Sequence, residues 1–226
     1  MQPLAVVRLG TVPYAEAFAL QRRLVEARQA DAIEDVLLLL EHPPTITHHN
    51  TGRGLENLRV GVEELAARGV ALEPTDRGGN VTLHAPGQLL GYPILRLRDH
   101  DLHGYLRSLE EVLIRAAAAL GAETARVPGR TGTWLPDGSA KLAAIGVKAS
   151  RWVTLHGFAM NVSTDLGLFD LIVPCGIADA GVTSLRRLGL DASVSAARDA
   201  VEAAFAQVFD AEVSQPSDAL CTLLPP

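Results

Sequence analysis

The spacing of apolar positions along this chain predicts a mixture of strands and helices. Residues 35–41 include four consecutive leucines without polar alternation, a pattern typical of a strand that is covered on both faces. Residues 4–9 and 92–97 are similar short apolar runs, and they predict two more strands. In residues 81–84 apolar and polar side chains alternate, as they do on the two faces of one strand.

Three longer stretches carry the helical period instead. The first follows Pro13, a residue that suits the first turn of a helix. The second begins at a cap, either Asp99 or Asp101, and ends before Gly121. The third covers about residues 193–209, where small and apolar residues recur on one side. Strands and helices of this kind predict an α/β fold with a buried sheet.

Other stretches have no clear period and predict irregular structure. Residues 47–58 contain Thr-His-His-Asn and Gly-Arg-Gly, and we expect an exposed loop there. Residues 62–68 predict a short helix that ends at Gly69. Residues 127–136 are rich in turn-forming residues and lead into strands around Lys141.

Composition and charge narrow the class of protein. The chain has 226 residues, 48% hydrophobic and 20% charged, as ordinary globular proteins have. No apolar run approaches the roughly 20 residues of a membrane span, and the first residues lack the features of a signal peptide. We therefore expect a cytoplasmic protein, whose two cysteines, Cys175 and Cys221, are free thiols. The net charge of −6 argues against nucleic acid as a partner.

Two polar stretches are candidates for binding. His48 and His49 have no further ligand at metal-binding spacing, so we expect no metal site. In residues 76–88, Arg77 could hold an acidic group while Gly78 and Gly79 let the backbone approach a ligand closely. The same residues would equally suit a glycine bulge between strands with a surface arginine. Composition alone does not separate these two interpretations.

The stretch from residue 140 to residue 177 combines an amine and a thiol. Lys141 and Cys175 are 34 residues apart, so only a fold that doubles back, such as a meander of strands, brings them together. Taken singly, Cys175 would more often be a buried structural thiol, and Lys141 a solvated lysine on a strand. The two residues alone therefore do not establish catalysis.

Seven separated motifs change this picture. They occur in one order over about residues 38–185: Glu41-His-Pro-Pro44, Arg77-Gly-Gly-Asn-Val-Thr-Leu-His84 with Pro86-Gly-Gln88, Lys141-Leu-Ala-Ala-Ile-Gly-Val-Lys148, His156-Gly-Phe-Ala159, Asn161-Val162, Pro174-Cys-Gly176 and Gly181-Val-Thr-Ser-Leu185. Together they resemble the lipoyl(octanoyl) transferase family. Two departures are Ala85, where the family usually has glycine, and the loop at residues 48–50.

This resemblance implies both a fold and a reaction. The fold would be one catalytic domain over residues 1–226, with a mixed central sheet flanked by helices, similar to biotin protein ligases and lipoate ligases. The enzyme would move an octanoyl or lipoyl group from acyl carrier protein to a lysine of a lipoyl domain or of the glycine-cleavage H protein. It would act as a monomer, without ATP, a metal or another cofactor, and without contact to a membrane.

The resemblance also implies roles for individual residues. Cys175 would be the nucleophile that carries the acyl group as a thioester, and Lys141 would favour its thiolate form. The acyl-substrate site would be lined by Arg77, Gly78, Gly79, Asn80, Val81, Thr82, Leu83, His84, Ala144, Ile145, Gly146, Gly157, Phe158 and Ala159.

Two other functions are compatible with parts of the pattern. An ATP-dependent lipoate ligase would share the fold but would not need Cys175, and a non-catalytic acyl-binding module could lose either Cys175 or Lys141. The presence of both residues in motif favours the transferase. Because acyl carrier proteins are acidic, we also expect a basic docking patch beside the catalytic stretch, with four candidate residues: Arg126, Arg130, Lys148 and Arg151.

Overall fold

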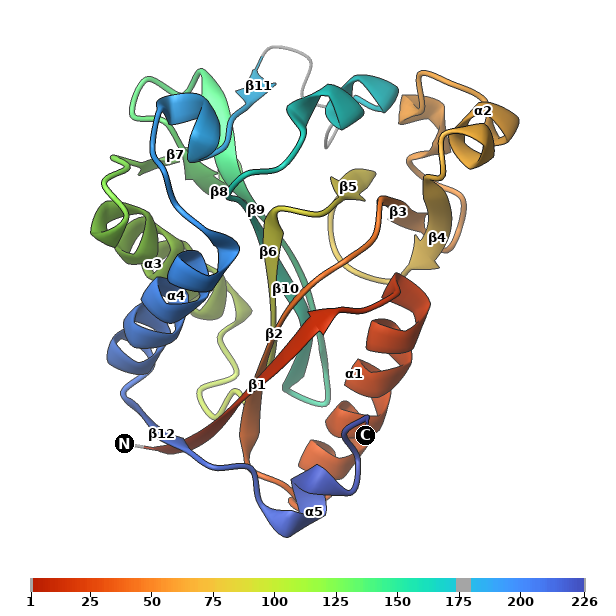
Figure 1. Ribbon diagram of the computed structural model, residues 1–226. Coiled ribbons are helices and arrows are strands. Elements are labelled where there is room, and N and C mark those ends of the chain that lie inside the picture. The colour runs from red at the N-terminus through yellow and green to blue at the C-terminus, as the bar shows by residue number, and fades with distance from the viewer. Residues whose placement is uncertain (1, 174–179, 226) are drawn as a thin grey trace.

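A computed structural model of the chain describes residues 2–173 and 180–225, and its centre is a mixed β-sheet of nine strands (Figure 1). The strand order is β12-β1-β2-β6-β10-β9-β8-β7, and β11 pairs with β9. The bounds of these strands are β1 (Gln2–Thr11), β2 (Asp35–Glu41), β6 (Gln88–Ile94), β7 (Ala125–Val127), β8 (Arg130–Trp134), β9 (Ala140–Ser150), β10 (Val153–Asn161), β11 (Gly181–Val182) and β12 (Ala211–Ser214).

The leucine-rich strand β2 lies inside this sheet, as its sequence predicts. It pairs in parallel with β1 and antiparallel with β6, and its five central residues are buried. A strand with neighbours on both edges and helices on both faces has no polar surface to present, so it needs no polar alternation. The predicted strand at residues 4–9 lies within β1, and the run at 92–97 belongs to β6 only as far as Ile94.

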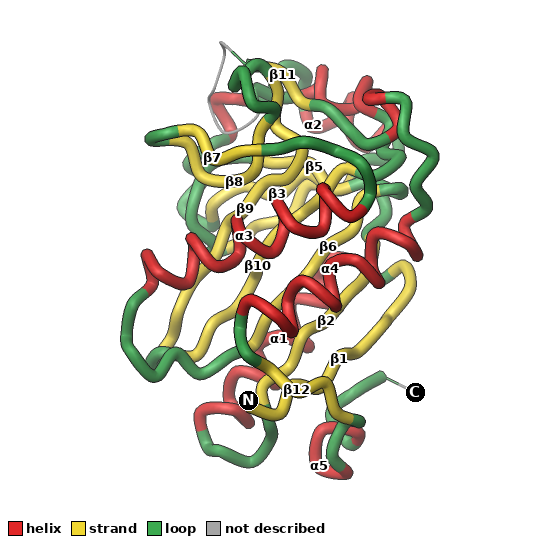
Figure 2. Tube along the Cα trace, turned by 90° about the vertical axis from the view of Figure 1, so that its left-hand side faces the viewer, coloured by secondary structure: helices red, strands yellow, loops and turns green. Residues whose placement is uncertain are grey.

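Helices cover both faces of the sheet. Helix α1 (Tyr14–Gln29) lies on one face, and α3 (Leu102–Ala119) and α4 (Val194–Val208) pack together on the other (Figures 1 and 2). The side chain of Asp101, one of the two predicted caps, accepts a hydrogen bond from the Gly104 amide at the start of α3. The short helices are α2 (Val62–Ala67), α5 (Asp218–Cys221) and the 3-10 turns η1 (Leu55–Asn57), η2 (Leu166–Leu171) and η4 (Arg186–Leu188).

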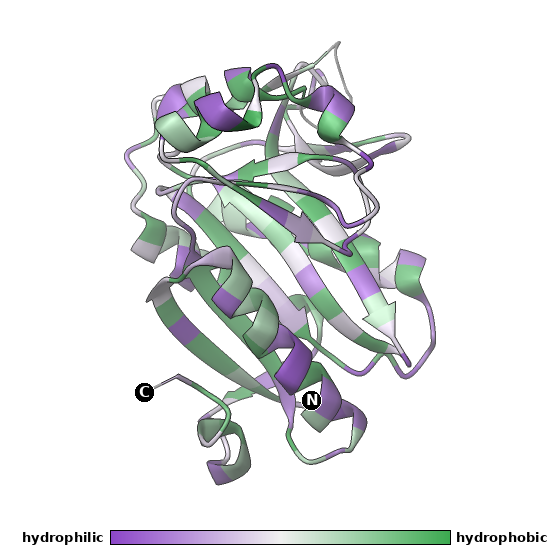
Figure 3. Cartoon of the chain, turned by 90° about the vertical axis from the view of Figure 1, so that its right-hand side faces the viewer, coloured by the Kyte–Doolittle hydropathy of each residue, from purple (hydrophilic) through white to green (hydrophobic). Residues whose placement is uncertain are grey.

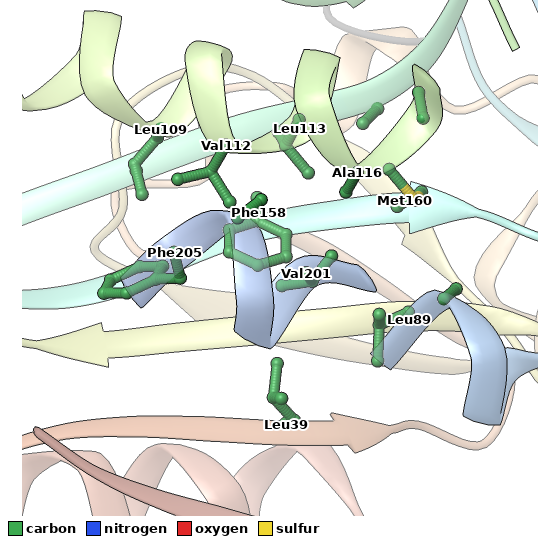
Figure 4. Packing of buried hydrophobic residues seen from close by; sticks show 14 of the residues in the cluster. Leu39, Leu89, Leu109, Val112, Leu113, Ala116, Phe158, Met160, Val201 and Phe205 are labelled. Carbon is green, nitrogen blue, oxygen red and sulfur yellow. The ribbon is translucent and has the colours of Figure 1, made fainter. Parts of the chain in front are cut away.

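The sheet separates two hydrophobic cores. Beneath α3 and α4, side chains such as Leu113, Phe158 and Phe205 interlock, as Figure 4 shows. On the other face, α1 packs its apolar side on the strands, which carry long hydrophobic stretches in Figure 3. The burial of apolar surface on both faces fixes the two-sided α/β architecture that the sequence predicts.

The observed strands correct two expectations of irregular structure, the first through a second, smaller sheet. Residues 47–58 are not wholly a loop, because β3 (Thr45–His49) pairs with β4 (Ala71–Thr75) and β5 (Thr82–His84). Thr47 is fully buried there, so pairing with two neighbours outweighs the polar composition of the segment. Residues 127–136 are likewise not only turns, since most of them belong to β8 and to its neighbour β7 at the edge of the central sheet.

Candidate active site

Lys141 and Ala144 face the same side of β9 because that strand contains a bulge. Two neighbouring residues of β8 pair with Lys141 and Ala143, so β9 carries one extra residue, Leu142, at this point. In a regular strand, positions three apart would face opposite sides. Leu142 and Ala143 are buried in the core under α3, whereas Lys141 and Ala144 line one pocket.

We name this pocket the lysine pocket, because Lys141 forms part of its wall. Lys141 lies at its wall with Trp134 of β8, Asn161 of β10 and Gly181 of β11. The Lys141 residue is only 9% exposed, and its Nζ atom lies 4.6 Å from the centre of the Trp134 ring. These observations exclude the solvated strand lysine that the residue alone would suggest.

A second pocket adjoins the first, and we name it the arginine pocket because Arg77 lines it. The two pockets share Thr82, Ala144 and Ala159, so they form the two halves of one site. Small side chains at 144 and 159 leave room between the halves. Eleven of the fourteen residues predicted for substrate binding line the arginine pocket: Arg77, Gly78, Gly79, Thr82, His84, Ala144, Ile145, Gly146, Gly157, Phe158 and Ala159.

Five of the predicted binding residues direct their side chains elsewhere. Val81 and Leu83 are buried in the core between the small sheet and η2, and the Oδ1 atom of Asn80 accepts a hydrogen bond from the Val81 amide. Phe158 lines the arginine pocket, but its ring lies in the core under α3 and α4 (Figure 4), and the side chain of its cross-strand partner Ile145 packs against the same core. These five residues shape the site by supporting its walls.

Arg77 is held inside the protein, so the surface-arginine interpretation is wrong. The residue is 8% exposed, and its guanidinium donates to the hydroxyl and the carbonyl of Thr47 on β3. The next residue, Gly78, donates its amide to the Val147 carbonyl of β9 over 3.0 Å. A Cβ atom at Gly146 would lie 2.9 Å from the Gly78 carbonyl, so glycine is required where the loop meets the strand.

His156 points into the arginine pocket through an unusual backbone conformation. Its φ angle is 59°, whereas its neighbours along β10 alternate in the regular manner between the two cores. This conformation turns the imidazole toward α1, where it stacks on Phe18 at 5.1 Å and its Nε2 atom contacts Asp76 at 2.7 Å. A left-handed conformation in a non-glycine residue costs energy and often marks a functional position.

Asp76 carries a negative charge between two partners. Its other carboxylate oxygen lies 2.8 Å from Nζ of Lys148. The hydrogen bond from His156, together with Lys148, holds the pKa of Asp76 well below its usual range. Burial lowers the pKa of His156, so the imidazole is neutral at pH 7 and donates its Nε2 proton to the carboxylate.

A buried polar chain links the floor of the arginine pocket to the lysine pocket. Nδ1 of His84 contacts the Gln88 side chain at 2.8 Å, and Gln88 donates to the Asn161 side chain at 2.9 Å. Asn161 in turn donates to the Thr183 carbonyl, and the Thr183 amide donates to the Lys141 carbonyl. This chain fixes the segment after β11 against the strand that carries Lys141.

Burial also determines the charge of the histidines below the pocket. It lowers the pKa of His84 to about 3 and that of His42 to about 4. His42 donates to the Val12 carbonyl, and its Nε2 atom accepts a hydrogen bond from the Tyr92 hydroxyl. Both histidines are therefore neutral hydrogen-bonding groups at pH 7.

Several site residues were missed from the sequence. Gln88 and Asn161 lie inside the quoted motifs but were assigned no role, and Trp134 was seen only as part of a turn-rich segment. Tyr14 lines the arginine pocket from α1, far away in sequence. Its place could not be found from local pattern, because it depends on where α1 packs on the sheet.

The predicted nucleophile, Cys175, lies outside the described residues. The other cysteine, Cys221, is exposed in α5 near the C-terminus.

Within residues 2–173 and 180–225, no group of three or more His, Cys, Asp and Glu side chains could hold a metal ion. In the same part of the chain, none of the helices has the length and apolar character that a membrane span requires.

The four cations proposed as a docking patch are divided between two places. Arg126 forms ion pairs with Glu110 and Glu111 of α3, on one face of the sheet. Lys148 pairs with Asp76 on the side of α1, at the far end of β9. Two of the four charges are thus already matched by carboxylates, which weakens the case for one continuous patch.

Comparison with known proteins shows the family to which the chain belongs. The chain matches the family described as "Lipoyl protein ligase A/B catalytic domain" over residues 13–206. Since the match covers most of its length, the chain belongs to that family.

Curated relatives narrow the assignment further. An octanoyltransferase of Rubrobacter xylanophilus is 50% identical over 202 residues, which are 88% of this chain and 90% of that protein. An octanoyltransferase of Chloroflexus aggregans is 50% identical over 214 residues, or 93% and 96% of the two chains. Within the family the chain is therefore an acyltransferase of the octanoyltransferase type, as its motifs predict.

Solved structures confirm the predicted fold. The bipartite lipoate protein ligase of Thermoplasma acidophilum superposes with a TM-score of 0.78 at 17% identity, over 99% of this chain and 90% of that one. A biotin protein ligase of Aquifex aeolicus gives a TM-score of 0.53 at 13% identity, over 93% and 71% of the two chains. At these identities the likeness concerns the fold alone.

Proposed function

We propose that this enzyme takes an octanoyl group from acyl carrier protein and transfers it to a lysine of a lipoyl domain or of the glycine-cleavage H protein. The transfer proceeds through a thioester on Cys175, in the cytoplasm, and requires neither ATP nor a metal. The whole chain acts as one catalytic domain. The observation that carries the proposal is the buried Lys141 at one end of a continuous two-part site, in a chain half identical to octanoyltransferases.

In the first half of the reaction the Cys175 thiolate attacks the carbonyl carbon of the donor thioester. A tetrahedral intermediate forms and collapses, and the carrier sulfur leaves as a thiolate that takes a proton from Lys141. The acyl group is now bonded to Cys175, and Lys141 is neutral. One thioester replaces another, so the step is close to neutral in free energy and needs no nucleotide. The Lys141 ammonium stabilises the thiolate before the attack.

In the second half the acceptor amine attacks the thioester of Cys175. An amide bond forms, the thiolate leaves, and the amine must lose a proton. Lys141 is the group in the lysine pocket that can accept this proton, because the negative charge of Cys175 is absent while the acyl group is attached. The protonated lysine then stabilises the thiolate that leaves, and the enzyme returns to its first state.

The acyl chain itself would occupy the arginine pocket. Ala144, Gly146 and Ala159 provide walls with little bulk, and Gly78 and Gly79 bring backbone against the chain. Arg77 is tied to Thr47 and Gly78, so its role is to hold the loop that closes the pocket. His84 and His156 complete the pocket as neutral groups.

The proposal is tested by mixing the enzyme with octanoyl-acyl carrier protein and an unmodified lipoyl domain, in the absence of nucleotide and with a chelator. We expect the mass of the lipoyl domain to rise by one octanoyl group. Transfer that occurs only with free octanoate and ATP would contradict the proposal and would identify an ATP-dependent ligase. No transfer under either condition would favour an acyl-binding module.

A further inference from the structure

Trp134 has a relationship to Lys141 that neither the motifs nor the proposed reaction uses. Trp134 of β8 pairs directly with Lys141 of β9, so their side chains are cross-strand neighbours. Nζ of Lys141 lies over the indole ring, 4.6 Å from its centre. This distance is well inside the roughly 6 Å over which an aromatic face attracts a cation.

The indole ring is itself firmly held. Trp134 is 1% exposed, and its N–H group donates to the Arg130 carbonyl over 3.3 Å. The guanidinium of Arg130 also lies over the ring, 5.4 Å from its centre. A ring fixed in this way can position a flexible lysine side chain, which otherwise has many conformations of similar energy.

The surroundings give the ring an electrostatic role as well. A lysine amine in an apolar pocket tends to lose its proton, because burial disfavours the charged form. Of the described residues that line the lysine pocket, Lys141 is the one titratable group, and Arg130 is the charged group on the neighbouring strand. The negative face of the indole ring therefore opposes the effect of burial.

We propose that Trp134 is a positioning residue for Lys141: its indole face holds the ammonium group at the wall of the pocket and stabilises its charged form. The consequence for catalysis rests on the proposed function, in which Lys141 is charged beside the Cys175 thiolate and gives up its proton only in the acyl-enzyme. Trp134 would set how readily that change occurs. The charged form of Lys141 would depend on the aromatic face of Trp134 and not on the size of its side chain alone.

The chain allows a direct test because it contains two tryptophans. The other one, Trp152, is 39% exposed and stacks on His100 at the turn between β9 and β10. In a Trp152→Phe background, Trp134 is the single tryptophan and can be replaced during expression by mono-, di- and trifluorinated tryptophan. Each added fluorine weakens the negative face with little change in shape.

The first measurement is ¹⁹F NMR of the resting enzyme as a function of pH. We expect a titration of the Trp134 fluorine signal that is absent in Lys141→Met and in the permanently charged Lys141→Arg. Its midpoint should move down by about 0.5 pH unit across the fluorination series, because the charged lysine loses stabilisation. A signal without a Lys141-dependent titration, or a midpoint that fluorination does not move, would overturn the inference.

The second measurement separates this inference from the proposed function. In single-turnover transfer from the acyl-enzyme, the rising limb of the pH–rate profile should shift to lower pH in the same fluorinated series. If the NMR midpoint moves while this limb does not, the contact between Trp134 and Lys141 stands but Lys141 is not the base of the transfer step. Trp134→Phe, which keeps an aromatic face, should retain more activity than Trp134→Leu.

Discussion

Nε2 of His156 lies 2.7 Å from Oδ1 of Asp76, and this contact exists only because the backbone of His156 has a φ of 59°. The left-handed conformation turns the imidazole away from the core under α3, toward α1 and the small sheet. The backbone amide of His156 is satisfied there by Oε1 of Gln21 on α1, over 2.7 Å. Asp76 precedes Arg77, so this contact ties the loop of the arginine pocket to the central sheet.

We expect Asp76→Asn to lower stability by about 1 kcal/mol at neutral pH, because Asp76 is partly exposed and screening limits its ion pairs. A carboxylate with a depressed pKa stabilises the fold above its unfolded pKa of about 4 and loses this effect as the pH falls. The difference between wild type and Asp76→Asn should therefore shrink progressively as the pH falls below about 4 toward the depressed folded-state pKa of Asp76. Urea unfolding between pH 7 and 2.5 measures it, with exposed Asp99→Asn as the control. A difference that stays constant with pH would show that the charge of Asp76 is not what stabilises the loop.

The buried His42 predicts a loss of stability in mild acid. Its folded-state pKa is about 4, below the ordinary value of about 6.5, so the unfolded chain binds the proton more readily. Stability is then complete above pH 6.5 and is lost as the pH falls toward 4. His42 should contribute a loss of about 2 kcal/mol between pH 7 and pH 5. Denaturant unfolding should show that the free energy of unfolding of His42→Gln falls by about 2 kcal/mol less between pH 7 and pH 5 than that of the wild type. The exposed variant His103→Gln should keep the wild-type slope of stability against pH. An unchanged slope in His42→Gln would contradict the assignment of a neutral buried imidazole.

The bulge in β9 can be tested through the glycine opposite it. A Cβ atom on Gly132, which has a φ of 109°, would lie 2.5 Å from the Ala143 carbonyl. Gly132→Ala should therefore cost at least about 3 kcal/mol, and it should displace Lys141 and reduce acyl transfer. Gly129 on the same hairpin also has a positive φ of 76° but open space around it, so Gly129→Ala should cost only about 1 to 2 kcal/mol. Thermal and denaturant unfolding measure the loss of stability in each variant. Equal losses would mean that the loss comes from backbone strain at a positive φ and not from contact with the bulge.

Much of the fold could be predicted because the central elements carry strong local patterns. β2 has an unbroken leucine run, and α3 has both a capping aspartate and a glycine after its end. β3 could not be recognised, since its polar residues are stabilised by strands that lie about 26 and 37 positions further along the chain. A local reading of Thr47 and His48 contains no information about those partners.

The parts of the site that are formed by backbone could be predicted, because glycine motifs and the family resemblance identify where the backbone approaches the substrate. Gly78 and Gly146 both line the arginine pocket, and the close approach of the Gly78 carbonyl explains why position 146 needs glycine. The direction of His156 and the bulge at Leu142 depend on backbone geometry that a strand pattern does not reveal. The regular alternation of a strand would place His156 on the opposite face of β10.

The role of Lys141 as a base predicts unequal effects on the two half-reactions. A cysteine near pKa 8.5 gains about 16-fold in thiolate at pH 7 if its pKa falls to about 7, but its lower nucleophilicity reduces the gain in rate to about 3-fold. The acceptor lysine, in contrast, is only about 0.04% neutral at pH 7 and needs a base. Lys141→Met should thus slow acyl transfer to the lipoyl domain more than acylation of the enzyme. Single-turnover kinetics measure each step; equal losses, or a larger loss in acylation, would contradict this role.

The central claim is that the acyl group passes through Cys175, and intact-protein mass spectrometry tests it most directly. The enzyme is incubated with octanoyl-acyl carrier protein alone, without nucleotide or acceptor, and the adduct is then located by peptide mapping. We predict one octanoyl group on Cys175 in the wild type and in Cys221→Ala, and none in Cys175→Ala, which should also lose turnover. An adduct on Cys221, or full turnover by Cys175→Ala, would contradict the account.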